Sequence, residues 1–218
     1  ILGEVTMRSD PASIAFEASL FDVLRTGLRI TRGDPRLATR AMRLLWRQKT
    51  AVGRRDRAER RGVHVPPFVI YSVTGRCNLQ CAGCYARLLH QHERPELTAE
   101  RMARLLEEAK DLGVSVMLLA GGEPLLRPDL LEQVGRRPEI LFLLFSNGSL
   151  LDDARIGQLA RMPHVLPVLS LEGEEKETDE RRGDGTYEHV TGAMERLSRA
   201  GAFFGTSLLT TLVSAGVD

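Results

Sequence analysis

The chain has 218 residues, of which 43% are hydrophobic and 27% charged, as in a globular protein with one large domain or one domain plus an appendage. No apolar run approaches the roughly 18 residues of a membrane-spanning helix, which argues against a transmembrane protein. Thirty basic and 29 acidic residues leave a net charge of +1. A protein that works by polyphosphate binding alone is therefore not indicated.

The cysteine content points to a reducing compartment. Only three cysteines are present, and an odd, small number does not support a disulfide framework, so we expect a cytoplasmic protein. The chain begins with Ile1 and no signal-peptide pattern follows, so we expect a segment of a longer chain.

Charge divides the chain into two parts. Residues 1–66 carry 14 basic and 7 acidic side chains, whereas residues 67–218 carry 16 and 22. We predict a basic N-terminal helical segment over residues 1–66 and a core domain over residues 67–218.

The N-terminal part predicts helices at Ala12–Arg29 and from Pro35 to about Arg60, with Asp34 as the N-cap of the second. The second helix has a basic face of Arg36, Arg40, Arg43 and Arg47 and an apolar face of Leu37, Ala41, Leu44 and Leu45. We expect the apolar face to dock on the core domain. The alternative is peripheral contact with an anionic membrane surface or an acidic partner. Trp46 is the only aromatic residue of this helix, so nucleic acid is not expected.

From Pro66 onward, short apolar runs alternate with helical stretches, which predicts an α/β fold of repeated βα units. The predicted strands are Phe68–Val73, Val114–Ala120, Ile140–Ser146, Val165–Leu171 and Phe203–Leu212. The predicted helices are Thr98–Leu112, Pro128–Val134, Asp152–Arg161 and Tyr187–Ala200. Right-handed crossovers make such strands parallel, and functional sites form at their carboxyl ends.

All three cysteines follow the first predicted strand, as Cys77, Cys81 and Cys84. Spacings of four and three residues are typical of metal ligands, and three thiolates could bind three irons of an iron–sulfur cube. The alternative is a zinc site completed by His64, His90 or His92.

The C-x3-C-x2-C pattern after a first strand resembles the radical S-adenosylmethionine (SAM) superfamily. The resemblance implies a [4Fe-4S] cluster whose open iron is chelated by SAM. In that family an aromatic residue usually precedes the third cysteine, whereas this chain has Gly83 there and Tyr85 just after it. Tyr85 is therefore our candidate for closing the adenine pocket.

Three later segments agree with the resemblance. Gly121-Gly122-Glu123-Pro124 ends the second strand and resembles the family's SAM-amino motif: strand-end carbonyls can accept from an ammonium, glycines admit a ligand close to the backbone, and Pro124 ends the strand. Asn147 follows the third strand, as a SAM or substrate contact or as part of an ordinary Asn-Gly turn. At the fourth strand, Ser170 and Glu172 could hold the ribose, and Arg182 could pair with the SAM carboxylate.

The resemblance implies a partial βα barrel, because only five of the family's six βα units are visible. It also implies reductive cleavage of SAM and hydrogen abstraction from a small-molecule, peptide or lipid-like substrate, with an electron donor such as flavodoxin or ferredoxin. We expect Val69, Tyr71, Val73, Leu118, Leu143 and Phe145 to line the barrel interior. The competing hypothesis is a zinc-stabilised, non-catalytic binding module with a partner- or membrane-docking helix.

Overall fold

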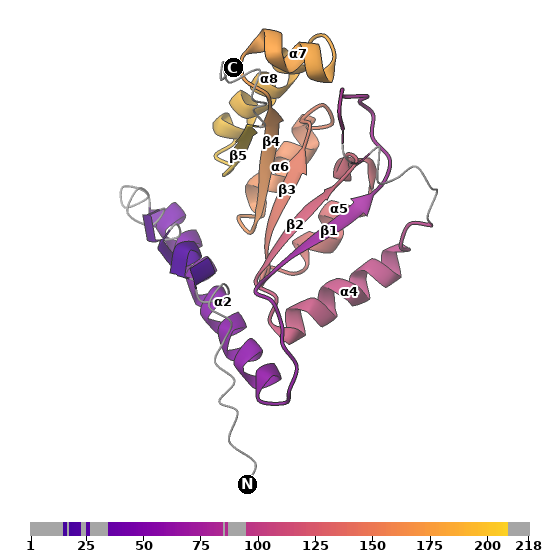
Figure 1. Ribbon diagram of the computed structural model, residues 1–218. Coiled ribbons are helices and arrows are strands. Elements are labelled where there is room, and N and C mark those ends of the chain that lie inside the picture. The colour runs from indigo at the N-terminus through magenta and orange to yellow at the C-terminus, as the bar shows by residue number, and fades with distance from the viewer. Residues whose placement is uncertain are drawn as a thin grey trace.

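The structure, a computed structural model, describes residues 15, 16, 18–22, 25, 26, 35–84, 86 and 95–208, without the side chains of residues 36 and 37. Within these residues, five parallel strands form one sheet in the order β1-β2-β3-β4-β5. They are β1 (Phe68–Thr74), β2 (Val116–Gly121), β3 (Leu141–Ser146), β4 (Val165–Leu171) and β5 (Gly205–Leu208). Figure 1 shows them fanning out toward their carboxyl ends, which confirms the predicted partial βα barrel.

The strand boundaries differ from prediction mainly at two ends. β2 begins at Val116 rather than Val114, because Val114 donates its N–H to the preceding helix, at the carbonyl of Ala109. The fifth strand begins at Gly205 rather than Phe203 and is described to Leu208. Residues 209–212 of its predicted span lie outside the described residues.

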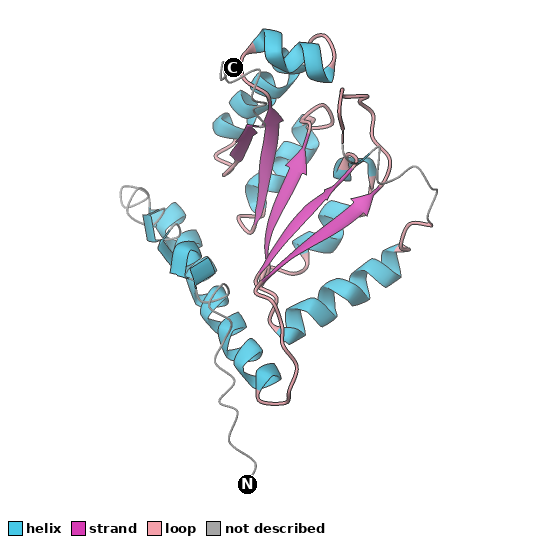
Figure 2. Cartoon of the chain, in the orientation of Figure 1, coloured by secondary structure: helices cyan, strands magenta, loops and turns pink. Residues whose placement is uncertain are grey.

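Helices of the described residues cover one face of the sheet (Figure 2). They are α4 (Ala99–Leu112), α5 (Leu130–Gly135), α6 (Asp153–Arg161) and α8 (Thr186–Arg199). Thr98 caps α4 by accepting from the N–H of Arg101. Between these helices and the strands lies the main core, which includes Met102, Phe142 and Leu197. The sequence did not predict the short 3-10 helix η2 (Pro124–Leu126) or α7 (Glu175–Arg182).

The orientation predicted for β1 is wrong. Val69, Tyr71 and Val73 pack into the helix-side core, whereas Phe68 and Ile70 lie on the opposite, inner face, where Ile70 is 65% exposed. Both faces of a parallel strand are apolar, so alternation alone does not distinguish them. The inner-face prediction is confirmed for Leu118, Leu143 and Phe145, which line cavities there.

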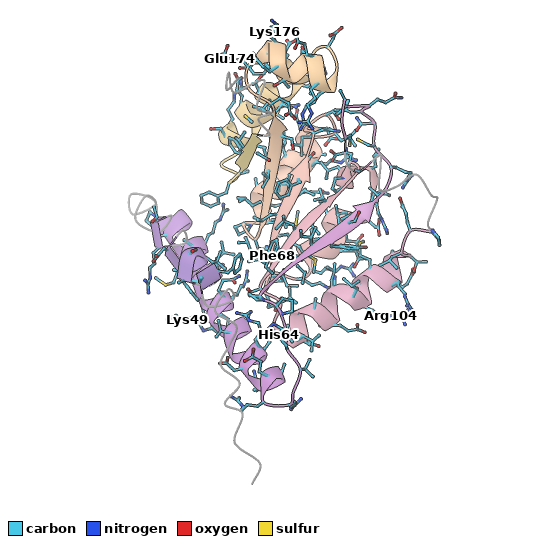
Figure 3. The ribbon with its side chains drawn as sticks, viewed as in Figure 1. Lys49, His64, Phe68, Arg104, Glu174 and Lys176 are labelled. Atoms are coloured by element: carbon cyan, nitrogen blue, oxygen red, sulfur yellow. The ribbon has the colours of Figure 1, made fainter. Side chains whose placement is uncertain are left out.

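The helix α2 (Pro35–Glu59) docks on the amino end of the sheet. Leu44 is buried against Val116 and Leu141, and the side-chain amide of Gln48 donates to the carbonyl of Ser115 at 3.1 Å. Phe68, labelled in Figure 3, lies on the side of the sheet that faces α2. The docked arrangement expected for the apolar face is confirmed for Ala41 and Leu44, and the side chains of Arg36 and Leu37 lie outside the described residues.

In the helix predicted at Ala12–Arg29, the described residues 15, 16, 18–22, 25 and 26 are helical. Phe16 packs on Phe68, with ring centroids 5.7 Å apart. No helix among the described residues is both long and apolar enough to cross a membrane.

Candidate functional site

A cavity of about 320 Å³ lies at the carboxyl edge of the sheet. Nine of the residues predicted from the sequence line it: Cys77, Cys81, Cys84, Gly121, Gly122, Glu123, Asn147, Ser170 and Arg182. Pro124 lies behind this lining as the buried first residue of η2, and Glu172 is buried beside it. Tyr85, His90 and His92 lie outside the described residues. The fold therefore brings together segments that are far apart in sequence.

The three cysteines enter the cavity from the loop after β1. All three are free thiols; Cys77 is exposed, and Cys81 and Cys84 are partly buried. Burial raises the pKa of the Cys81 thiol, and the charge of Arg182 opposes this shift. No three Cys, His, Asp or Glu side chains in the described part converge on the position of a single metal ion. A cubic cluster needs no such point, because each thiolate binds a different iron.

Gly121, the last residue of β2, and Gly122 place their backbone directly against the segment that leads from β1 into the cysteine loop. Gly122 donates its N–H to the carbonyl of Thr74 at 2.8 Å, and Glu123 donates to that of Arg76 at 2.8 Å. A Cβ atom on Gly122 would lie 2.0 Å from the carbonyl oxygen of Arg76, and one on Gly121, whose φ is +124°, 2.4 Å from that of Thr74. In this structure, then, the glycines are required by the close approach of two backbone segments. The sequence had suggested only the approach of a ligand.

The Glu123 side chain joins the ends of β2 and β3. Its carboxylate accepts from the N–H of Leu125 at 3.1 Å, from the hydroxyl of Ser146 at 3.0 Å and from the N–H of Asn147 at 2.8 Å. Burial raises the pKa of Glu123, although these hydrogen bonds oppose the shift. The carboxylate thus fixes the turn that carries Asn147.

Asn147 links this turn to the cysteine loop. Its side-chain Nδ2 donates to the side-chain oxygen Oδ1 of Asn78 at 3.0 Å and lies 3.9 Å from the sulfur of Cys77. The side-chain oxygen Oδ1 of Asn147 accepts from the N–H and the hydroxyl of Ser149. Since both ends of the amide have protein partners, Asn147 is held in one orientation at the cavity wall.

At the end of β4, Glu172 forms a buried ion pair with two arginines. Its side chain is 4% exposed, Arg181 donates to one carboxylate oxygen, and the Nε of Arg182 donates to the other at 2.8 Å. Both arginines line the cavity, whereas Glu172 does not. Glu172 therefore orients cationic groups at the cavity wall.

Four polar residues of this site were not predicted from the sequence: Asn78, Ser146, Arg181 and Ser207. Arg181 lies in α7, whose charged sequence lacks an apolar period. One signal was present, because Glu175 and Glu177 in its first turn and Arg181 and Arg182 in its last turn complement the helix dipole. Ser207 becomes recognisable only through strand pairing, where it is the register partner of Ser170.

The fold and the site together define a class, a partial βα barrel with a thiol-lined cavity at the carboxyl ends of its strands. Residues 71–214 match the model of the Radical SAM superfamily. The chain therefore belongs to the radical SAM superfamily, and its cofactors are SAM and a [4Fe-4S] cluster.

Named relatives agree with this assignment. The chain is 32% identical over 119 residues to the Fe-coproporphyrin III synthase of Methanosarcina barkeri, covering 54% of this chain and 30% of the relative. It is 34% identical over 125 residues to the PqqA peptide cyclase of Granulibacter bethesdensis, covering 56% and 33%. The chain thus spans about a third of the length of these relatives.

A solved structure gives the same fold. The crystal structure of Streptococcus suis SuiB bound to S-adenosylmethionine superimposes with a TM-score of 0.60 at 20% identity, covering 79% of this chain and 39% of SuiB. At this identity the likeness establishes the fold.

The residues of the cavity fit the two cofactors. Three free thiols on one loop are the donor set that an iron–sulfur cluster takes. Arg182, on the same cavity wall, is a fork of donors suited to a carboxylate. The zinc-stabilised, non-catalytic alternative is set aside, because superfamily membership identifies an enzyme.

Proposed function

We propose that this chain is the core of an enzyme that cleaves SAM reductively and abstracts a hydrogen atom from a substrate. Cys77, Cys81 and Cys84 would hold the [4Fe-4S] cluster, which would supply the electron for reductive cleavage of a carbon–sulfur bond of SAM, and the cleaved SAM would supply the hydrogen-abstracting group. The observation that carries the proposal is the shared cavity, in which the three cysteines face the Gly121–Glu123 turn and Arg182.

The protein's contribution is binding, orientation and exclusion of water. We assign iron binding to Cys77, Cys81 and Cys84, which their common loop supports. We assign the SAM amino group to the backbone of Gly121, Gly122 and Glu123, with Pro124 ending the strand behind them.

The remaining SAM contacts follow the cavity wall. Arg182 pairs with the SAM carboxylate, supported by its anchorage on Glu172. Ser170 is assigned to the ribose and Asn147 to SAM or substrate, because both line the cavity. Glu172, predicted for the ribose, has both carboxylate oxygens bonded to Arg181 and Arg182 and does not line the cavity, so we assign it to holding Arg182. Tyr85, outside the described residues, stays our candidate for the adenine pocket.

Anaerobic purification tests this proposal. We expect a brown protein with iron and sulfide near four each per chain, by the stoichiometry of this cluster type. With dithionite and SAM it should release 5′-deoxyadenosine. A colourless protein that holds one zinc and leaves SAM intact would overturn the proposal.

For the substrate, we propose a peptide or a small molecule, with a lipid-like compound as a further class. Support comes from the relatives, whose names specify a porphyrin-type product and a peptide. Incubating the reduced enzyme with candidates from each class and measuring 5′-deoxyadenosine above the substrate-free rate would distinguish them.

We propose a cytoplasmic location, in which the free thiols stay reduced. We propose flavodoxin or ferredoxin as the electron donor. The exposed position of Cys77 supports access of such a donor to the cluster from the protein surface. Replacing dithionite with each reduced donor should sustain SAM cleavage.

We propose a domain division at residues 66 and 67, supported by the docking of α2 against the sheet.

We also propose that α2 contacts an anionic membrane surface. Its support is the exposure of Met42 and Trp46, at 56% and 66%, next to Arg43. Co-sedimentation with anionic vesicles at low salt that is lost in Trp46→Ala would support it, and no co-sedimentation would refute it.

A further inference from the structure

The last turn of α7 is bonded to the cysteine loop through Arg181. Its backbone carbonyl accepts from the N–H of Ala82 at 2.8 Å, and its side-chain Nε donates to the carbonyl of Ala82 at 3.2 Å. Ala82 lies between Cys81 and Cys84, so both polar backbone groups of one loop residue are bonded to the same arginine. Figure 1 shows α7 beside the loop that follows β1.

The guanidinium that reaches the loop is itself fixed from the other side. Its Nη1 donates to Glu172, whose carboxylate is buried at the end of β4 and shared with Arg182. A planar guanidinium with several donors in fixed directions can bridge a carboxylate and a carbonyl, which an ammonium on a flexible chain does less well. The loop is therefore tied to β4 through one side chain.

We infer that Arg181 is a positioning residue that holds the Cys81–Cys84 part of the loop for cluster binding. The inference rests on the proposed function and deepens it. A loop that orders only when the cluster binds spends part of the binding free energy on ordering, whereas a pre-positioned loop does not. The first half of the loop has its own ties, through Arg76 and Asn78, so Arg181 acts on the second half.

Three variants test this role against simple charge neutralisation. Arg181→Gln removes the clamp and the charge, Arg181→Lys keeps the charge but not the fork, and Glu172→Gln/Arg181→Gln removes the ion pair as a whole. Lys176→Gln is the matched control, because Lys176 is an exposed cation on the same helix (Figure 3).

The readouts are iron per chain, the rate of cluster loss to a chelator, the electron paramagnetic resonance spectrum of the reduced cluster, and the melting temperature of the apoprotein. We expect cluster loss about tenfold faster in Arg181→Gln, the effect of one charge-assisted hydrogen bond. Arg181→Lys and the double variant should also lose the cluster faster than wild type, and Lys176→Gln should lose it at the wild-type rate.

The outcomes separate the two proposals. Wild-type protein without a cluster would refute the proposed function. A wild-type cluster retained equally well in Arg181→Gln would refute the positioning role alone. Wild-type cluster retention in Arg181→Lys or in the double variant would also overturn the positioning role, because charge balance alone would then be sufficient to retain the cluster.

Discussion

The inner face of the sheet has two contrasting ends. At the amino end, a cavity of about 480 Å³ is lined almost entirely by apolar side chains, among them Leu44 of α2, Phe68 and Leu141. At the carboxyl end, the cavity wall consists of thiols, backbone amides, hydroxyls and arginines. Leu118 lines the carboxyl-end cavity and its register partner Leu143 lines the amino-end cavity, so the two regions are continuous.

The two ends differ in the weight of apolar burial. At the amino end it secures α2, together with the hydrogen bond of Gln48 to the carbonyl of Ser115. At the carboxyl end, hydrogen bonds between segments distant in sequence fix the groups. We therefore expect substitutions at the amino end to change stability and substitutions at the carboxyl end to change chemistry.

The largest effect is expected at the carboxyl end. Cys81→Ala should abolish cluster assembly and SAM cleavage while leaving the fold largely intact, because the thiol lies on a loop outside the main core. Iron content, 5′-deoxyadenosine release and circular dichroism check this. Retained cleavage with dithionite would contradict it.

At the amino end, Leu44→Asp should lower the free energy of unfolding by about 3 to 5 kcal/mol, since it buries an unpaired charge. Met42→Asp, at an exposed position of the same helix, is the control and should be nearly neutral. Urea unfolding measures both. Equal stability in the two variants would mean that α2 is not docked as described.

Gly122→Ala tests the close contact between two backbone segments at the carboxyl end of the sheet. The added Cβ strikes the carbonyl oxygen of Arg76, so we expect a loss of about 1 to 3 kcal/mol and a displaced cysteine loop. Gly192→Ala in α8, where a Cβ meets nothing within 4 Å, should be neutral or stabilising. Similar behaviour of the two variants would show that the close approach is not needed.

Glu172→Ala should weaken SAM binding while the cluster still assembles on the three thiols, although the cluster should be lost faster than in wild type because Arg181 also loses its anchor. Arg182 loses the carboxylate that orients it, which corresponds to about 1.5 to 3 kcal/mol, or roughly a tenfold to hundredfold change in affinity. Calorimetry on the anaerobic protein measures the affinity, and the exposed Glu180→Ala serves as control. An unchanged affinity would leave Glu172 with a purely structural role.

The smallest expected effect is on the pH dependence of folding stability, through a histidine at the amino end of the sheet. Burial lowers the pKa of His164, at the start of β4, below its ordinary value of 6.5. The unfolded chain therefore binds a proton that the folded chain excludes, and stability is lost as pH falls through 6.5 toward the folded pKa. His164→Gln can keep the hydrogen bond to the carbonyl of Val134 and should reduce this dependence, as urea midpoints at pH 7.5 and 5.5 would reveal. An identical pH profile in both proteins would contradict it.

The sequence predicted the elements with a regular pattern well. Strand β4 is predicted to the residue, and Thr98 marks the start of α4. The side of β1 that faces the helices was not predictable, because apolar residues occupy both faces of that strand. Helix α7 was missed because eight polar or charged residues give no apolar period.

For the site, local sequence identified the groups but not their partners. The cysteines and the Gly121–Pro124 turn are recognisable because each motif is contiguous. The second role of Glu172, as the anchor of Arg181, depends on how α7 folds back over the end of β4, and no local pattern records that. Sequence patterns thus predicted which residues meet at the cavity better than what each one touches.

The contact between Ala82 and Arg181 joins residues 99 positions apart. Closing a loop of this length costs conformational entropy, which earlier contacts in the intervening chain reduce, so we expect β2, β3 and β4 to join the sheet before the cysteine loop acquires its tie to α7. During synthesis the three thiols leave the ribosome long before α7 does. Cluster delivery to a growing chain and cluster delivery to a finished apoprotein are consequently different reactions, the first with an untied loop and the second with a tied one.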